Sequence, residues 1–300
     1  MAGARVCPPR SLERFARGVF AALGADRDTA AEVARHLVGA NLAGHDSHGV
    51  IRVPHYVGLA DAGELDPAAR PVVAREGVIT ALIDARRGFG QVSTAFALDW
   101  AAGRARERGL AAAAVRGSNH IGRLGEYTER AAALGLIAIV TVGGAGPGIG
   151  GVVPHGGRDR FLSTNPWSIG VPAGDRPPLI FDAATSTIAE GKVRVARARG
   201  SPLPPGAIVD RHGRPSTDPE DFYAGGALLP LGGAVAGHKG YGLGLAAALL
   251  GGLAMIDDPA PPLAGTAGAN APPPETYGRI AGVFLAVIDP AAFGDGAAYQ

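Results

Sequence analysis

The stretch LIAIVTVGGAGPGIGGVVPHGG, residues 136–157, separates two kinds of α/β fold. Its first seven residues form an apolar, β-branched run that is typical of a buried strand. Gly146, Gly148 and Gly151 then satisfy the spacing G-x-G-x-x-G, which in a Rossmann fold opens a helix whose N–H groups hold a pyrophosphate. Here Pro154 and two more glycines follow, so no helix is expected to start. The stretch predicts a strand and a glycine-rich loop, outside the Rossmann pattern.

On both sides of this stretch, short apolar runs alternate with segments of helical periodicity, which predicts an α/β protein. Proline-rich segments at 200–237 and 258–275 are expected to be loops, and we find no internal repeat. Strands are expected at 78–84, 110–118, 136–142, 160–172, 179–185 and 279–289, and helices at about 91–108, 122–134 and 239–255.

The N-terminal part is expected to be helical. Ser11 can cap a helix that runs through Leu23, and Asp26 or Asp28 can start a second helix that ends near Gly44. The helical pattern breaks over 44–49 and then resumes, which predicts a helix-break-helix corner. We therefore divide the chain into an N-terminal helical layer, 1–75, and a mixed α/β region, 76–300.

The composition excludes several classes of protein. Apolar residues make up 47% and charged residues 18%, so the chain has enough material for a core. The net charge of +1 argues against nucleic acid or a membrane surface as the main partner. The longest apolar stretch, 240–255, is shorter than the ~20 residues that span a bilayer. A single cysteine, Cys7, and an N-terminus without the apolar core of a secretion signal predict a cytoplasmic location.

The segment HDSHGVIRVPHY, residues 45–56, concentrates polar side chains at the predicted corner. A metal site would take His45, His48 and His55, but no complete ligand set accompanies them and none is predicted. His48 and Arg52 lie at i, i+4, and a histidine that moves a proton beside an arginine that grips a carboxylate suits a small carboxylate substrate. The alternative is the polar face of an amphipathic helix.

Two further segments carry candidate residues. In SNHIGRLGEY, residues 118–127, His120 lies between a strand and a helix, where α/β proteins place their sites, although it could simply cap the helix. In GHKGYGLG, residues 237–244, Lys239 stands at the start of an apolar helix. A cation is disfavoured at a helix N-terminus unless an anion lies nearby, so a bound phosphate would explain it.

Taken in order, the motifs DSHGVIRVPHY, SNHIGRLGEY, STNPWSIGVP, IFDAATS, AEGKV and HKGYGLGL resemble the malate/L-lactate dehydrogenase family of the second, non-Rossmann type. That family includes ureidoglycolate, sulfolactate and diketogulonate enzymes and cyclic-imine reductases. The resemblance covers about residues 10–290. It implies a mixed-sheet α/β fold, a homodimer, and an oxidoreductase that uses NAD or NADP to transfer a hydride to or from C2 of a small 2-hydroxy or 2-oxo carboxylate.

The resemblance also implies roles for individual residues. The proton-transfer residue of the family falls on His48 or His120, between which the resemblance does not choose. Arg52 matches the arginine that holds the substrate carboxylate, with Ser47 and Tyr56 in the same pocket. The implied cofactor contacts, all within the 76–300 region, are Thr164, Asn165, Leu179, Ile180, Phe181, Asp182, Ala183, Ala184, Thr185, His238 and Lys239.

Two departures from the family pattern leave alternatives open. Gly143 and Gly144 stand where relatives carry a polar residue, which puts one cofactor contact in doubt. The sequence also ends at Gln300, whereas relatives continue for several dozen residues that are expected to complete the cofactor region. The leading hypothesis is thus a 2-hydroxy acid oxidoreductase, with two rivals: a reductase of cyclic imines, and a catalytically silent homologue that retains the fold.

Overall fold

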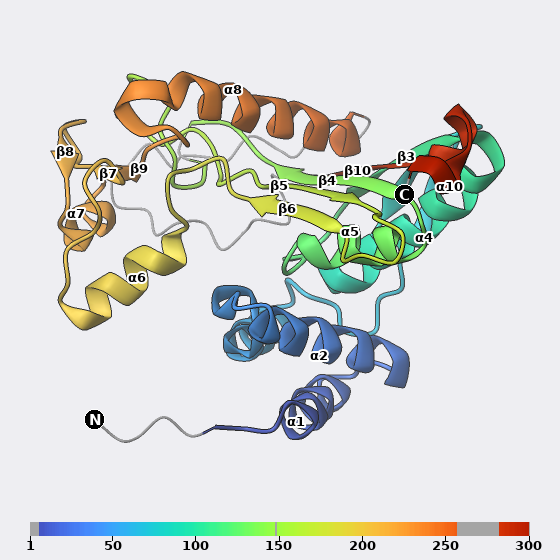
Figure 1. Cartoon of the computed structure of the whole chain (residues 1–300). Helices are drawn as coiled ribbons and strands as arrows, with labels where there is room; N and C mark the ends of the chain where they lie inside the picture. Colours follow the sequence, from blue (N-terminus) through green and yellow to red (C-terminus); the bar gives the residue numbers. More distant parts are fainter. Residues whose placement is uncertain (1–5, 148, 257–281, 300) are drawn as a thin grey trace.

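A mixed sheet forms the centre of the molecule. The computed structural model describes residues 6–147, 149–256 and 282–299, and in this part of the chain seven strands pair in the order β1-β2-β3-β10-β4-β5-β6 (Figure 1). β2 and β3 run parallel, and every other pair of neighbours in this sheet is antiparallel. The strands are β1 (Val72–Glu76), β2 (Thr80–Asp84), β3 (Leu110–Arg116), β4 (Ile137–Gly143), β5 (Trp167–Val171), β6 (Leu179–Ala183) and β10 (Gly282–Ile288).

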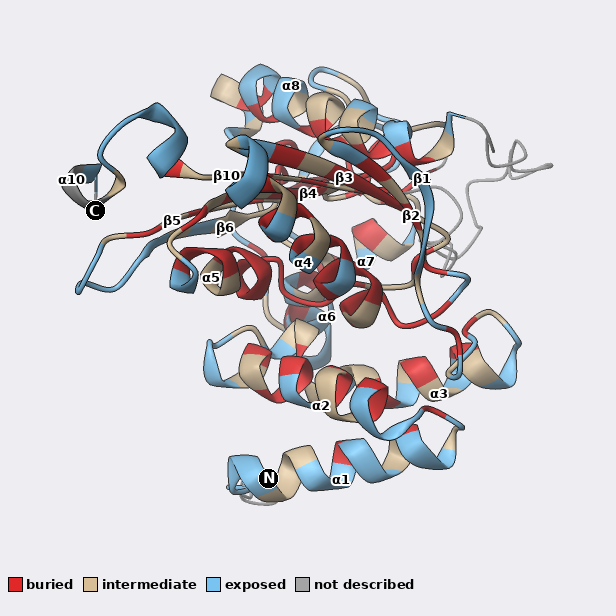
Figure 2. Cartoon of the chain, turned by 90° about the vertical axis from the view of Figure 1, so that its right-hand side faces the viewer, coloured by how far each residue is buried: buried red, intermediate tan, exposed pale blue. Residues whose placement is uncertain are grey.

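Helices cover both faces of this sheet. α8 (Gly233–Gly252) packs on β4 and β10, whereas α4 (Gly90–Arg108) and α5 (Gly125–Ala133) pack on the opposite face (Figure 1). The N-terminal helices form a further layer, in which α2 (Arg27–Leu42) contacts α4 and α5, and α1 (Pro9–Ala22) packs against α2. Figure 2 shows the buried residues along the sheet and on the inward faces of these helices. His48, Tyr56 and His120 lie where the N-terminal layer meets the sheet layer.

Glycines allow α8 to approach the sheet closely. A Cβ on Gly143 would lie 2.2 Å from the backbone of Ala247, and one on Gly282 would lie 2.0 Å from the carbonyl oxygen of Gly251. No side chain fits at such distances, so these positions require glycine. Gly143, which departs from the family pattern, therefore has a packing role in this chain.

A second, smaller sheet lies at the end of the molecule that carries α6 and α7 (Figure 1). Buried Val193, Leu203, Ile208 and Phe222 form its core. We expected 200–237 to be a loop, but two-residue strands have no measurable periodicity, so their pairing is invisible in the sequence. The elements are α6 (Glu190–Arg199), β7 (Ile208–Val209), β8 (Pro215–Ser216), α7 (Pro219–Tyr223) and β9 (Ala227–Leu228).

The α/β class and the mixed sheet predicted from the sequence are confirmed, and residues 149–160 contain no helix after the glycine-rich stretch. Two details differ from expectation. α1 begins at Pro9 rather than after Ser11, because proline is well suited to the first helical position. β1 was missed because it is an edge strand with every residue exposed, so it lacks the apolar alternation of a half-buried strand.

Other expectations are met in part. Asp26 caps α2, since its side chain accepts hydrogen bonds from the N–H groups of Asp28 and Thr29, each at 3.0 Å. The strand expected at 160–172 is confined to β5. The loop expected at 258–275 and the first residues of the strand expected at 279–289 lie outside the described residues. The remaining short helices are η3 (Leu253–Met255), η4 (Pro290–Phe293) and α10 (Gly296–Tyr299).

Within the described residues, no helix combines the length and apolar character needed to cross a bilayer. The 20-residue helix α8 is broken in its first turn, because Ala236 has non-helical backbone angles (φ −126°, ψ 15°).

Candidate active site

The predicted corner after α2 is built around Asn41. Its side-chain oxygen accepts a hydrogen bond from the N–H of Val50 at 2.9 Å, and its nitrogen donates to Asp46 at 2.5 Å. A Cβ on Gly49 would lie 2.3 Å from the Asn41 oxygen, so the motif needs glycine there. Two single-turn 3₁₀ helices, η1 (Asp46–His48) and η2 (Val50–Arg52), lead into α3 (Val53–Asp61). Hydrogen bonds and close packing thus hold the corner in place.

Three predicted site residues meet in this corner. Ser47 Oγ lies 3.0 Å from His48 Nδ1, and Arg52 Nε donates to the carbonyl oxygen of Ser47 at 2.7 Å. This hydrogen bond positions the guanidinium but leaves its two terminal nitrogens available. Arg52 is partly exposed, and among the described residues it pairs with no carboxylate.

His120 lies in the loop that follows β3, and its two neighbours anchor that loop. Ser118 Oγ lies 3.2 Å from Ser93 Oγ on α4, and Asn119 Nδ2 donates to the carbonyl oxygen of Arg87 at 2.8 Å. The motif SNH therefore combines two residues that anchor the loop with His120, whose ring contacts Tyr56 and His48. The sequence alone did not separate these roles.

The His120 ring is held from behind by a chain of buried side chains. Tyr56 Oη lies 2.7 Å from His120 Nδ1, and Gln91 Nε2 donates to the same hydroxyl at 2.7 Å. Tyr56 is 1% exposed and Gln91 is fully buried. Tyr56 thus contacts His120, and Arg52 lies close enough for its charge to oppose the rise in the Tyr56 pKa that burial causes. Gln91 was missed because it opens a predicted helix 35 residues away from Tyr56 and carries no motif of its own.

The corner and the loop bring His48 and His120 together. Their rings stack with centroids 5.4 Å apart and an interplanar angle of 25°. Burial, followed by the Arg52 charge, lowers the pKa of His48 to about 4. The same two causes, in the same order, hold the pKa of His120 well below its ordinary value. Both rings are therefore neutral at pH 7 and able to accept a proton.

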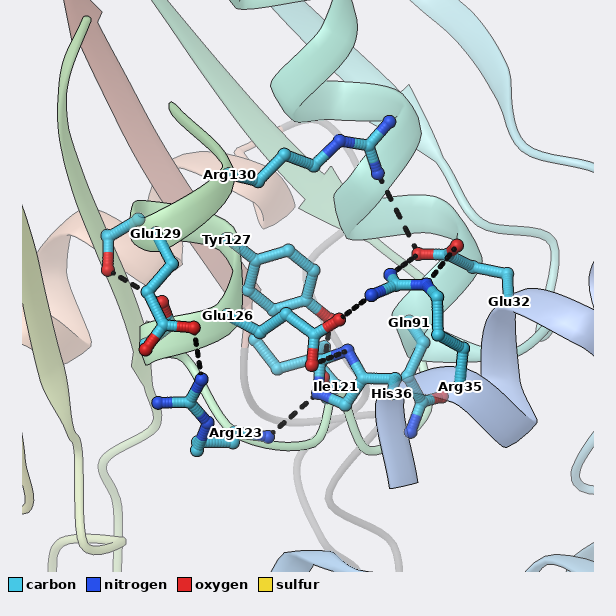
Figure 3. A network of polar contacts seen from close by, with 12 residues as sticks. Glu32, Arg35, His36, Gln91, Ile121, Arg123, Glu126, Tyr127, Glu129 and Arg130 are labelled. Carbon is cyan, nitrogen blue, oxygen red and sulfur yellow. Dashed lines mark hydrogen bonds and ion pairs between the residues drawn. The ribbon is translucent and has the colours of Figure 1, made fainter. Parts of the chain in front are cut away.

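A neighbouring histidine on α2 has a different setting. His36 is completely buried, its Nε2 accepts a hydrogen bond from the N–H of Arg123 at 3.0 Å, and its Nδ1 lies 3.6 Å from Glu126 (Figure 3). Arg35 binds Glu126 and Glu32 beside it. Burial lowers the pKa of His36 to about 3 and raises that of Glu126. This cluster joins α2 to the segment that follows His120.

The residues predicted to contact the cofactor include some whose side chains bond to nearby backbone groups and others that lie along β6. Asn165 is completely buried and bonds to backbone groups of Gly144 and Gly244, and Thr185 Oγ1 donates to the carbonyl oxygens of Thr164 and Asn165. These side chains shape the backbone next to the glycine-rich loop. On β6, Leu179 and Phe181 are exposed, whereas Ile180, Asp182 and Ala183 are partly buried. Ala184, which follows the strand, is also partly buried.

The segment that follows β6 connects these residues with the corner. Asp182 accepts a hydrogen bond from the N–H of Gly125, at the start of α5, at 2.7 Å. Burial raises the pKa of Asp182, and the Gly125 hydrogen bond opposes that effect. Further along, a Cβ on Gly191 would lie 3.1 Å from the Cβ of Ser47. Residues 182–191 thus run from the sheet to the His48 corner.

His238 and Lys239 are exposed on the first turns of α8. The ring of His238 lies 5.6 Å from that of His155, which follows the glycine-rich loop. Within the described ranges, neither His238 nor Lys239 forms a hydrogen bond or ring contact with the His48–His120 pair. Nor do the described residues contain a cluster of three or more His, Cys, Asp or Glu side chains arranged to hold a metal ion.

Comparisons with known proteins agree with this architecture. The chain is 40% identical over 245 residues to hydroxycarboxylate dehydrogenase B of Escherichia coli K12, a match that covers 81% of this chain and 66% of that protein. It is 39% identical over 234 residues to a Δ1-pyrroline-2-carboxylate/Δ1-piperideine-2-carboxylate reductase of Pseudomonas syringae pv. tomato, covering 78% and 66%. The matches therefore span slightly less than two thirds of these relatives.

A solved structure shows the same fold. Sulfolactate dehydrogenase from Methanocaldococcus jannaschii superposes with a TM-score of 0.83 at 30% identity, covering 98% of this chain and 81% of that one. The family model described as malate/L-lactate dehydrogenase matches residues 7–300. The resemblance inferred from the six motifs is thereby confirmed, and the chain belongs to the malate/L-lactate dehydrogenase family.

Proposed function

We propose that the protein is a nicotinamide-dependent oxidoreductase that interconverts small 2-hydroxy and 2-oxo carboxylates. One observation carries this proposal: the partly exposed Arg52 has free terminal nitrogens and no carboxylate partner among the described residues, beside two neutral histidines. A guanidinium in this setting binds a carboxylate through two parallel hydrogen bonds. The names of the relatives, which include hydroxycarboxylate and L-lactate dehydrogenases, agree with such a substrate.

Each side chain has a role in this proposal. Arg52 holds the substrate carboxylate, and the Ser47 hydroxyl, bonded to His48, helps to orient the ring of that histidine. His48 gives a proton to the C2 oxygen during reduction, as an imidazolium that forms once the substrate carboxylate offsets the Arg52 charge, and its neutral ring takes the proton back during oxidation. His120 donates a hydrogen bond to the same oxygen. We assign the hydrogen bond to His120 because buried Tyr56 already occupies its Nδ1, and the proton to His48 because its Ser47 partner is partly exposed.

The residues present fit a dinucleotide cofactor, either NAD or NADP. Lys239 and His238 are exposed on the first turns of α8, and His155 lies against His238, so donors suited to phosphate gather next to the glycine-rich loop. The segment 182–191 extends from Asp182 to the corner that carries Ser47. The nicotinamide supplies the hydride, and the protein supplies orientation and acid-base groups. Of the predicted contacts, Lys239, His238 and the 182–185 backbone suit this role best.

A cyclic-imine reductase is the second candidate. It is favoured by the relative from Pseudomonas syringae, whose name specifies pyrroline and piperideine carboxylates. These substrates also pair a carboxylate with a polarised C2, so Arg52 would hold them in the same way. The reduced atom would be an imine carbon instead of a carbonyl carbon.

The test is to follow NADH and NADPH oxidation with pyruvate, oxaloacetate, glyoxylate and a cyclic imine carboxylate. Wild type is compared with Arg52→Ala, His48→Ala and His120→Ala, and with Arg214→Ala as a control that removes an exposed arginine paired with Asp210. We expect Arg52→Ala to raise KM for the carboxylate while Arg214→Ala leaves it unchanged. A folded wild-type protein without turnover on any substrate would instead identify a catalytically silent homologue.

A further inference from the structure

The hydrogen-bond chain behind His120 has a direction, which the donor and acceptor capacities of its members determine. Gln91 Nε2 is a donor only, so the Tyr56 oxygen accepts that hydrogen bond. The tyrosine has a single hydroxyl proton, and its second close partner, at 2.7 Å, is His120 Nδ1. If Tyr56 accepted from both neighbours, its own proton would lack a partner on this line. The chain therefore runs from Gln91 to Tyr56 to His120.

We propose that Gln91 and Tyr56 are positioning residues that hold His120 in the tautomer with Nδ1 unprotonated and Nε2 protonated. This inference rests on the proposed function for its catalytic meaning, but the tautomer itself is a property of the protein alone. The Nε2–H group is then the one left for the C2 oxygen of a substrate. A wrong tautomer would present a lone pair there and could not donate a hydrogen bond during reduction.

Burial makes this preference strong. Tyr56 is 1% exposed and Gln91 is fully buried, so water cannot readily replace either hydrogen bond. The opposite tautomer would place a proton on Nδ1 against the Tyr56 hydroxyl and strand a buried donor. Leaving such a group unpaired costs enough to favour the proposed tautomer by about tenfold or more.

The same arrangement separates two roles for Tyr56. As a substrate-binding residue, it would contribute to KM. As a positioning residue it acts through the ring of His120, so its loss lowers kcat and leaves KM nearly unchanged. Its hydroxyl is already bonded to Gln91 and His120, which favours the second role.

The first experiment measures the tautomer directly, without substrate or cofactor. Wild-type protein labelled with ¹⁵N-histidine is studied by NMR at pH 7.5, with the His120 signals identified by their loss in His120→Gln. We expect a neutral ring protonated at Nε2. A ring protonated at Nδ1 in the wild type overturns the proposal.

Substitutions of Gln91 and Tyr56 then test whether these residues set the His120 tautomer. Gln91→Leu and Tyr56→Phe should shift the His120 ring toward a mixture of tautomers. Thr94→Val is the matched control, because it removes a buried hydroxyl from the same helix three residues further on, and it should leave the tautomer unchanged. An unchanged tautomer in both Gln91→Leu and Tyr56→Phe shows that neither residue sets it.

Kinetics complete the test. Tyr56→Phe should lower kcat about tenfold or more, with KM for the 2-oxo acid within about twofold of wild type. A raised KM with unchanged kcat would return Tyr56 to substrate binding and overturn its positioning role. If the wild type turns over no substrate, the proposed function fails, whereas the NMR result still decides the tautomer.

Discussion

At two junctions between the N-terminal helices and the described residues of the sheet region, a histidine with a lowered pKa lies at the centre. At one, His36 of α2 accepts a hydrogen bond from the backbone of Arg123 and faces Glu126 (Figure 3). At the other, His120 is bonded to Tyr56 of α3 and stacks on His48. Burial is the first cause of the lowered pKa at both histidines. A perturbed pKa therefore does not distinguish a structural histidine from a catalytic one.

What distinguishes them is the second ring nitrogen. His36 uses Nε2 for the Arg123 backbone, so its proton is on Nδ1, next to the Glu126 carboxylate. Both sides of that ring face protein, and Arg35 holds the carboxylate in place. His120 uses one nitrogen for Tyr56, and the partly exposed residue has the charge of Arg52 and the ring of His48 as neighbours. We therefore expect the junction at His36 to govern stability and the junction at His120 to govern activity. They are called the stability junction and the activity junction below.

The largest effect is expected from the activity junction. His120→Ala should lower kcat by about 10²–10³-fold, because it removes the hydrogen bond that stabilises the charge developing on the C2 oxygen. The unfolding free energy should change much less, and both quantities are measured on the same preparation by steady-state kinetics and urea unfolding. A His120→Ala enzyme with wild-type kcat would exclude His120 from catalysis.

The stability junction is tested by Gly122→Ala. Gly122 has φ +77°, and a Cβ there would lie 2.2 Å from Nε2 of His36. Strain and overpacking together should destabilise the protein by about 3 kcal/mol or more, measured by urea unfolding. Gly156→Ala is the matched control, since Gly156 has φ +76° and a Cβ added there would meet no atom within 4 Å. It should cost only about 1–2 kcal/mol, and equal losses would exclude the His36 contact as the cause.

Acid should weaken the stability junction specifically. The pKa of His36 is about 3 in the folded protein against an ordinary 6.5, so the unfolded chain binds an extra proton between these values. The stability that His36 contributes is complete above pH 6.5 and is lost as the pH falls toward 3. At pH 5 the loss from this residue is about 2 kcal/mol. His36→Gln should flatten the dependence of unfolding free energy on pH between 7 and 5, and an unchanged slope would contradict this assignment.

The smallest effect concerns the pH profile at the activity junction. In the free enzyme the pKa of His48 is about 4 and that of His120 is also lowered, so the acid limb of kcat/KM for 2-hydroxy acid oxidation should lie below pH 6.5. Arg52→Gln removes a positive charge that disfavours the protonated rings. The acid limb should therefore move to higher pH, alongside a raised KM, and a limb that stays in place would show that burial alone sets these pKa values.

Much of the architecture could be predicted from local pattern. The apolar run at 137–142 and the proline after the glycine-rich loop indicated a strand without a following Rossmann helix, and the structure agrees. Edge strand β1 and the two-residue strands of the small sheet could not be found, because they lack a periodic apolar signal. The central place of β10, between β3 and β4, also depends on hydrogen bonds between distant segments.

The candidate site divides in the same way. His48 and Arg52 are close in sequence, so their proximity at the corner followed from spacing. Gly143 shows the opposite case: its glycine could be read as a lost cofactor contact, whereas its environment shows that α8 leaves no room for a side chain. The type of a residue does not tell which groups it will contact in the folded chain.

The sequence by itself determined the periodic elements, the family and the residue types available for chemistry, because these depend on local periodicity and on short motifs. Only the tertiary structure decided which histidine is enclosed and which is accessible, and it did so by bringing Gln91 to Tyr56, Tyr56 to His120 and Arg123 to His36. Hydrogen bonds between residues 35, 64 and 87 positions apart follow from packing of the whole chain. For HDSHGVIRVPHY the motif supplies the acid-base and carboxylate-binding groups, and the fold supplies their partners.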